Sequence, residues 1–214
     1  MTLQAVLWDF GGVLTSSPFD AFARYESDHG LPKDFIRSIN AVNGDTNAWA
    51  LFERNEVDAA AFDDLFRAEA LAKGHDVPGK DVLALLSGDL RPKVIAALKA
   101  CKSRVKVGCI TNNVKSGKGA GMSFDAAKAG AVADVMTLFD HVIESSKIGL
   151  RKPDPRIYEL MCETLGVDPD QCIYIDDLGI NLKPARAMGM TTIKALNEAQ
   201  ILDDFAAATG FTLV

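Results

Sequence analysis

The sequence has few of the features that mark secreted, membrane-spanning or nucleic-acid-binding proteins. Its four cysteines form no C-x-x-C pair and have no histidine at zinc-ligand spacing, which argues against a disulfide framework or a zinc site. There is no apolar run of about 18 residues, and the first apolar run stops at Asp9, so neither a membrane span nor a signal peptide is expected. The net charge of −6 and pI near 5.1 argue against nucleic-acid or anionic-membrane partners. We expect a soluble, cytoplasmic protein.

The composition is that of an ordinary globular protein, with 48% hydrophobic and 24% charged residues. The chain of 214 residues is long enough to bury a core without disulfide bonds or structural metal ions. Short apolar runs that end at polar or glycine residues predict buried strands, at 4–8, 105–110, 172–175 and 191–195, with a weaker one at 141–143. Helical periodicity separates them, at 92–102, 155–165 and 182–188. Strands that alternate with helices predict an α/β fold with a doubly wound parallel sheet.

One connection is too long for a simple crossover. Roughly ninety residues separate the first strand from the next clear one, whereas about a dozen suffice. Within them, 19–28, 48–54 and 58–72 show apolar residues at helical spacing. We therefore expect a small helical cap at 17–88, inserted after the first strand, and a core formed by 1–16 and 89–214. The glycine-rich, basic stretch at 115–122 lacks the spacing of a phosphate-binding loop and is expected to be a surface loop.

Hydrogen-bonding or acidic side chains follow three of the predicted strands. These are Asp9, the pair Thr111 and Asn112, and the pair Asp176 and Asp177. In open α/β sheets the ligand site lies outside the carboxyl ends of the strands, so these side chains are expected to meet in one crevice. Lys152, just before a proline-marked helix start, would add a cation there.

Together these residues describe a phosphoryl-transfer site. Asp9 would be the carboxylate nucleophile that forms an aspartyl-phosphate. Magnesium suits an all-oxygen ligand set, here Asp9, the backbone carbonyl of Gly11, and Asp177 with help from Asp176. Lys152 would balance the carboxylates and bind phosphoryl oxygens. The Thr111 hydroxyl, with backbone groups near Gly12, Asn112 and Asn113, would bind the remaining oxygens of a small phosphorylated metabolite.

Four strings, DFGGVLT at 9–15, ITN at 110–112, KPDP at 152–155 and IDDL at 175–178, resemble in order the four motifs of the haloacid dehalogenase-like hydrolase superfamily. The stretch at 176–189 looks especially like the phosphatase domain of soluble epoxide hydrolase. The resemblance covers essentially the whole chain and includes the family's helical cap. It implies a Rossmann-like core, Asp9 as nucleophile, Thr111 and Lys152 as phosphate ligands, and Asp176 and Asp177 as the acids on the metal side.

The sequence departs from this resemblance at Gly11. Phosphatases of the superfamily usually carry a second Asp at that position, which acts as general acid and then base. Proton transfer of that kind contributes about 10²–10⁴-fold to rate, so its loss implies slow turnover, a substitute acid from the cap, or lost catalysis. His29, Asp45 and Glu53 are the cap residues considered for the substitute.

Three other interpretations were compared with the phosphatase. A 2-haloacid dehalogenase uses the same Asp without metal, but the extra carboxylates of Asp176 and Asp177 would repel its anionic intermediate. A signalling receiver domain has its acid pair near the first strand, whereas here the single Asp comes first. A catalytically weakened phosphate-binding protein stays open because of Gly11. Residues 43–49 and 115–122 are expected walls of the site, and the sequence contains no signal for an oligomeric state.

Overall fold

The computed structural model describes residues 2–113 and 126–211, so the stretch at 115–122 lies outside the described residues. In this part of the chain, five parallel strands form one sheet in the order β3-β2-β1-β4-β5. Their bounds are β1 Ala5–Trp8, β2 Lys106–Thr111, β3 His141–Glu144, β4 Cys172–Asp176 and β5 Thr191–Lys194. The predicted doubly wound α/β fold is confirmed, with β1 at the centre and the strand order reversing between β1 and β4.

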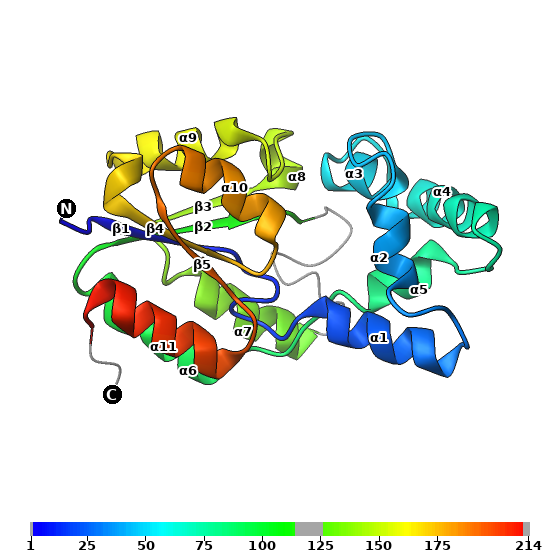
Figure 1. The fold of residues 1–214 in the computed structure, drawn as a ribbon, viewed down its shortest axis with the longest axis horizontal. Coiled ribbons are helices and arrows are strands. Elements are labelled where there is room, and N and C mark those ends of the chain that lie inside the picture. The colour runs from blue at the N-terminus through cyan, green and yellow to red at the C-terminus, as the bar shows by residue number, and fades with distance from the viewer. Residues whose placement is uncertain (1, 114–125, 212–214) are drawn as a thin grey trace.

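Helices cover both faces of the sheet (Figure 1). One face carries α6 (Pro92–Lys102), α7 (Ala126–Met136) and α11 (Glu198–Thr209), and the other carries α9 (Pro155–Leu165) and α10 (Gly179–Ala187). The short helices α8 (Ser145–Ile148) and η1 (Pro169–Gln171) lie in the connections. Sequence periodicity placed α6 and α9 at their observed bounds, but it missed α7 and α11 and began α10 three residues late.

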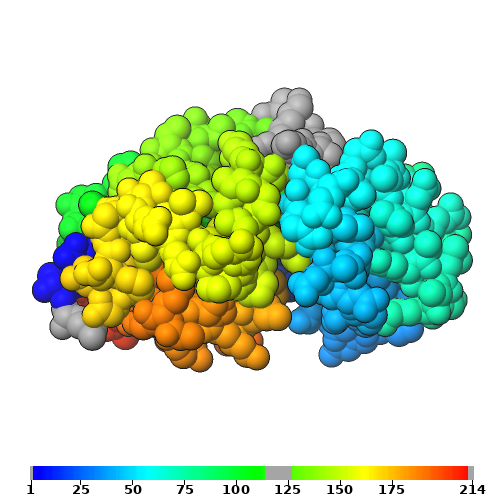
Figure 2. Space-filling model, turned by 90° about the horizontal axis from the view of Figure 1, so that it is seen from above, coloured from blue at the N-terminus to red at the C-terminus, as the bar shows by residue number. Residues whose placement is uncertain are grey.

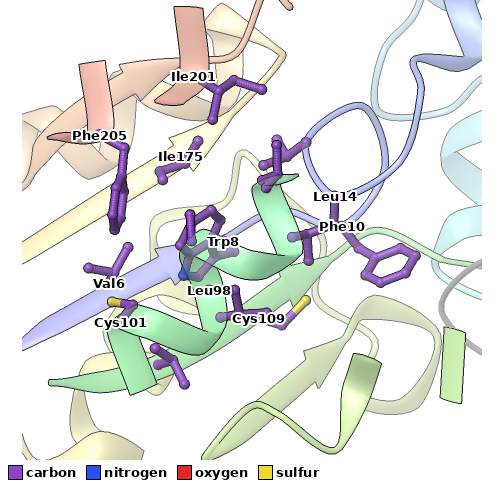
Figure 3. Packing of buried hydrophobic residues seen from close by; sticks show 14 of the residues in the cluster. Val6, Trp8, Phe10, Leu14, Leu98, Cys101, Cys109, Ile175, Ile201 and Phe205 are labelled. Atoms are coloured by element: carbon purple, nitrogen blue, oxygen red, sulfur yellow. The ribbon is translucent and has the colours of Figure 1, made fainter. Parts of the chain in front are cut away.

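The central strand is buried on both sides, as a strand of a doubly covered sheet must be. Val6 and Trp8 belong to the hydrophobic cluster beneath α6 and α11, while Ala5 and Leu7 belong to the cluster beneath α9 and α10. Figure 3 shows Trp8 facing Phe205 of α11, with ring centroids 5.4 Å apart. This packing fixes the strand whose end carries Asp9.

Between β1 and α6 lie five helices with a hydrophobic cluster of their own. They are α1 (Pro18–Asp28), α2 (Phe35–Asn40), α3 (Ala48–Glu53), α4 (Ala59–Ala72) and α5 (Gly79–Ala84). Phe62 lies inside this cluster, stacked on Phe52 with 4.6 Å between ring centroids. In Figure 1 the cap formed by α1–α5 lies beyond the carboxyl ends of the strands.

The chain leaves the core and returns to it at adjacent points. Thr15 and Leu90 form an isolated antiparallel bridge, and the Ser16 N–H donates to the Asp89 carbonyl at 2.7 Å. At the start of α1, the Ser17 side chain accepts from a backbone N–H and Pro18 occupies the first turn, a usual helix start. Two paired linkers therefore connect the cap to the strand ends.

Candidate active site

Asp9 is the first residue after the central strand. Trp8 is paired with Ile175, so Asp9 and Asp176, the next residues of their strands, lie side by side at the point where strand order reverses. Such switch points are the usual ligand sites of open α/β sheets. Asp9 is only 7% exposed, and its Oδ1 accepts the Phe10 N–H at 2.6 Å. Its Oδ2 accepts no hydrogen bond from the described residues.

Lys152 lies between the two carboxylates. Its Nζ is 2.8 Å from Asp9 Oδ1 and 2.8 Å from Asp176 Oδ2, and the residue is 1% exposed. Burial alone would lower the pKa of Lys152, but the charges of Asp176 and Asp9 more than offset this and raise it. The ammonium group is therefore a fixed positive charge inside the site.

The backbone of Lys152 is held as firmly as its side chain. The Asn112 amide accepts the Lys152 N–H at 2.9 Å and donates to the Lys152 carbonyl at 3.1 Å. Helix α9 begins at Pro155, where Asp154 caps it by accepting the Arg156 N–H at 3.0 Å. The end of β2 and the start of α9 together aim Lys152 at Asp9.

Asp176 is completely buried and saturated with hydrogen bonds. Both of its oxygens accept from the Asn181 amide at 3.1 Å, and Oδ1 also accepts the Leu178 N–H at 2.8 Å. The Tyr174 hydroxyl donates to Oδ2, beside Lys152. Neither Tyr174 nor Asn181 was predicted as a site residue. Tyr174 and Asp176 lie two residues apart on one strand and so share a face, but nothing in the sequence marks the Tyr174 hydroxyl as a partner of Asp176.

Asp177 is partly exposed and approaches the loop after β1. A Cβ built on Gly12 would lie 2.2 Å from Asp177 Oδ2, and Gly12 has a φ of +73°, so only glycine allows this approach. At Gly11 the same construction meets nothing within 4 Å, and its φ is not in the left-handed region. The Arg91 guanidinium, also missed by sequence analysis, donates to the Gly12 carbonyl at 2.9 Å.

The three acids lie close enough together to hold one cation. Carboxylate oxygens of Asp9, Asp176 and Asp177 all lie within 4.8 Å of one another. Burial raises the pKa of Asp177 to about 7, and the Asp176 charge adds to the rise. Burial also raises the pKa of Asp9, against the opposing charge of Lys152. One ammonium does not compensate three carboxylates, so an oxygen-bound divalent cation fits these residues.

The remaining predicted ligands lie at the end of β2. Thr111 is buried, and its hydroxyl makes no hydrogen bond to another residue of the described ranges. The Asn113 amide, in contrast, donates to Glu144 at 2.7 Å and accepts from the Ser146 hydroxyl at 2.9 Å. The side chains of Asn112 and Asn113 thus hold neighbouring segments in place, and their part in substrate binding stays a prediction.

The cap residues considered as proton carriers differ sharply in environment. His29 is exposed and stacks on Tyr25, with 3.9 Å between ring centroids, and Asp45 is exposed in the loop before α3. Glu53, at the end of α3, is 7% exposed and forms an ion pair with Arg151. Burial raises the pKa of Glu53, while Arg151 opposes the rise.

The sequence model of the haloacid dehalogenase-like hydrolases matches residues 3–189. The chain belongs to this family. It is 34% identical to a phosphatase of Mycobacterium tuberculosis, over 89% of this chain and 86% of that protein. It is 30% identical to bifunctional epoxide hydrolase 2 of Sus scrofa, over 100% of this chain but only 40% of that protein. The chain thus spans less than half of that relative.

Among solved structures, a HAD family enzyme of Bacteroides thetaiotaomicron, determined with magnesium and inorganic phosphate, has a TM-score of 0.59 at 21% identity. The alignment covers 94% of this chain and 98% of that chain, a likeness of fold. These relatives confirm the resemblance predicted from the motifs: the chain is a haloacid dehalogenase-like (HAD-like) hydrolase, and its relatives include a protein named as a phosphatase. In the described part of the chain, no helix combines the length and apolar character needed to cross a bilayer.

Proposed function

We propose that this hydrolase is a Mg²⁺-dependent phosphatase that acts on a small phosphomonoester through an aspartyl-phosphate at Asp9. The observation that supports it best is the charge arrangement: Lys152 lies buried between Asp9 and Asp176, with Asp177 next to them. Such a site is short of positive charge until a divalent cation joins it. A metal-free dehalogenase would gain nothing from the extra carboxylates, which repel an anionic intermediate.

In this mechanism the Asp9 carboxylate attacks phosphorus, the bond to the ester oxygen breaks, and the ester oxygen leaves as an anion that takes up a proton from water or from an acid in the site. Water then attacks the aspartyl-phosphate, releasing inorganic phosphate and regenerating Asp9. Lys152 and the Thr111 hydroxyl bind the phosphoryl oxygens, where negative charge builds up. Mg²⁺, held by Asp9, the Gly11 carbonyl and Asp177, with Asp176 beside it, would neutralise the anions that have to meet.

The step that Gly11 affects is protonation of the leaving alcohol, because Gly11 has no side chain to donate the proton. An aryl leaving group departs without protonation, whereas an alkoxide needs an acid. We expect the rate of the natural protein to fall steeply as the leaving-group pKa rises, from aryl to sugar and alkyl phosphates.

Gly11→Asp tests this directly, because a Cβ at Gly11 meets no atom within 4 Å. The variant should raise kcat/KM on alkyl phosphates by about tenfold or more and leave aryl phosphates nearly unchanged. Gly130→Asp, also in open space but on the surface of α7, is the matched control.

Rates are measured with Mg²⁺ and with chelator, and halide release from 2-chloropropionate is followed in parallel. Phosphate-ester hydrolysis that survives chelation would overturn the Mg²⁺ dependence, and halide release would replace the phosphatase with the dehalogenase. Binding of inorganic phosphate without any turnover would identify a phosphate-binding protein. A flat leaving-group dependence with good alkyl-phosphate turnover would show that another residue supplies the proton.

A further inference from the structure

The end of α3, in the cap, contacts the core beside Lys152. Arg151 forms an ion pair with Glu53 of α3 and donates to the Gly44 carbonyl at 3.1 Å. The Ser145 hydroxyl lies 3.2 Å from the Glu53 carbonyl and also accepts the Asn113 N–H at 3.0 Å. In Figure 2 the α3 region (cyan) lies directly against the segment that follows β3 (yellow-green). The side chains of Arg151 and Ser145 thus join the core to the cap, and we call this contact the seam.

Arg151 directly precedes Lys152 in the chain. Its contact with the cap therefore restrains the backbone next to Lys152. The Lys152 backbone is held from the core side by Asn112, and its Nζ reaches Asp9 and Asp176. The backbone at Arg151 and Lys152 is therefore held from two sides. Asn112 holds it against β2, and Glu53 holds it against the cap.

The Glu53–Arg151 pair differs from the other arginine–carboxylate pairs nearby. The side chains of Glu53 and Arg151 are 9% and 21% exposed. In the Arg54–Glu56 pair the carboxylate is 50% exposed, and in the Arg156–Asp154 pair the guanidinium is 67% exposed. Exposed pairs contribute little, whereas loss of one partner from a buried pair leaves an uncompensated charge. The buried pair is therefore the one whose loss would open the seam.

We propose that Glu53 and Arg151 are positioning residues, whose ion pair ties the cap to the segment of Lys152 and holds that lysine between Asp9 and Asp176. Docking of the cap and assembly of the phosphate-binding charge are then one event. The effect on catalysis rests on the proposed phosphatase function, but the effect on the position of Lys152 does not.

The test uses the full chain with Glu53→Gln, Arg151→Gln and the double variant. Glu56→Gln, from the exposed pair with Arg54, and Arg67→Gln, from the exposed Arg67–Asp76 pair, are matched controls. The reactivity of the Lys152 amine towards acetic anhydride is measured by mass spectrometry, with the exposed Lys93 as internal reference. We expect Lys152 to react about tenfold faster in both single variants, because a buried group becomes reactive through local opening. The controls should react like the natural protein.

The second measurement is hydrolysis of an aryl phosphate with Mg²⁺. Each single variant should lose about tenfold or more in kcat/KM, because small displacements of a positioned group are costly. The double variant should lose little more than either single one, since the two residues act through one contact. A purely structural role would lower the melting temperature and leave kcat and KM of the folded variants unchanged.

Circular dichroism checks that each variant is folded, and each single variant is a test by itself. Lys152 reactivity at the natural rate in the folded variants would overturn the proposal, whatever the phosphatase assay gives. Faster labelling of Lys152, combined with no hydrolysis by the natural protein, would support the positioning role and count against the proposed function instead.

Discussion

Replacing Asp177 by Asn should stabilise the metal-free protein while removing its response to Mg²⁺. Asp177 is partly exposed and lies beside the buried acids Asp9 and Asp176, and its pKa is raised from 3.8 to about 7, first by burial and then by the Asp176 charge. Keeping this carboxylate ionised in the folded state therefore costs roughly 4 kcal/mol of stability above pH 7. Asparagine has nearly the same shape and no charge, and should recover about 2 to 4 kcal/mol, since an amide also costs something to bury.

The pH dependence has a definite sign. Because the folded-state pKa lies above the ordinary value of 3.8, folded Asp177 holds its proton more tightly than the unfolded chain does. The destabilisation is absent below about pH 4, grows between about pH 4 and pH 7, and is complete above pH 7. The advantage of Asp177→Asn should therefore be largest at pH 8 and shrink at pH 5.

Urea and thermal unfolding in chelator, at pH 5 and pH 8, measure these differences. At pH 8 the melting temperature of Asp177→Asn should exceed that of the natural protein by about 5 to 15 °C. Added Mg²⁺ should stabilise the natural protein and leave the variant almost unchanged. Asp203→Asn, an exposed change on α11, is the control. Equal or lower stability of Asp177→Asn at pH 8 in chelator would refute the charge argument.

Three further substitutions test the other parts of the site. Asp9→Asn should abolish turnover and leave the fold intact, because the amide is a far poorer nucleophile. Lys152→Ala should destabilise the protein by about 3 to 5 kcal/mol, since it leaves two buried carboxylates without their cation, and should abolish vanadate binding. Gly12→Ala should weaken Mg²⁺ binding by about 10- to 100-fold, because the new methyl group displaces Asp177. Steady-state kinetics, urea unfolding and calorimetric titration with Mg²⁺ measure these three effects in turn. Turnover at the natural rate in Asp9→Asn would remove Asp9 from the mechanism. Unchanged vanadate affinity in Lys152→Ala would make Lys152 a structural lysine. Normal Mg²⁺ affinity in Gly12→Ala would show that Asp177 has room to move.

The strands were predictable because each is a short apolar run that ends at a polar or glycine residue, and all five predicted strands are present. The helices α2 and α5 were missed. At six residues each they span less than two turns and give only a weak helical period, although α3, which is equally short, was predicted from residues 48–54. In α11 only Ile201 and Phe205 are buried, and alanines elsewhere in the helix dilute the pattern. Periodicity thus identifies helices with a long apolar face and is less reliable for short or alanine-rich ones.

The main acids of the candidate site were predictable for a geometrical reason. Parallel strands carry whatever follows them to the same edge of the sheet, so Asp9 and Asp176 had to lie close together. The hydrogen bonds that hold them were not predictable. Tyr174 looks like a core residue of its strand, and only the tertiary structure shows that its hydroxyl donates to Asp176. The same holds for Lys152, which from the sequence could equally have been an exposed lysine before a helix.

The cap shows most clearly where sequence reasoning ended. His29, Asp45 and Glu53 were equivalent candidates for a proton carrier, because burial is a property of the folded chain and not of the residue type. The structure separates them, since Glu53 alone of the three is buried, and its carboxylate already faces Arg151. Because its carboxylate is already paired with Arg151, Glu53 is suited to fix the segment that contains Lys152. The source of the proton that Gly11 cannot supply and the role of the buried Glu53 are then separate questions. The leaving-group series answers the first, and the Lys152 labelling answers the second.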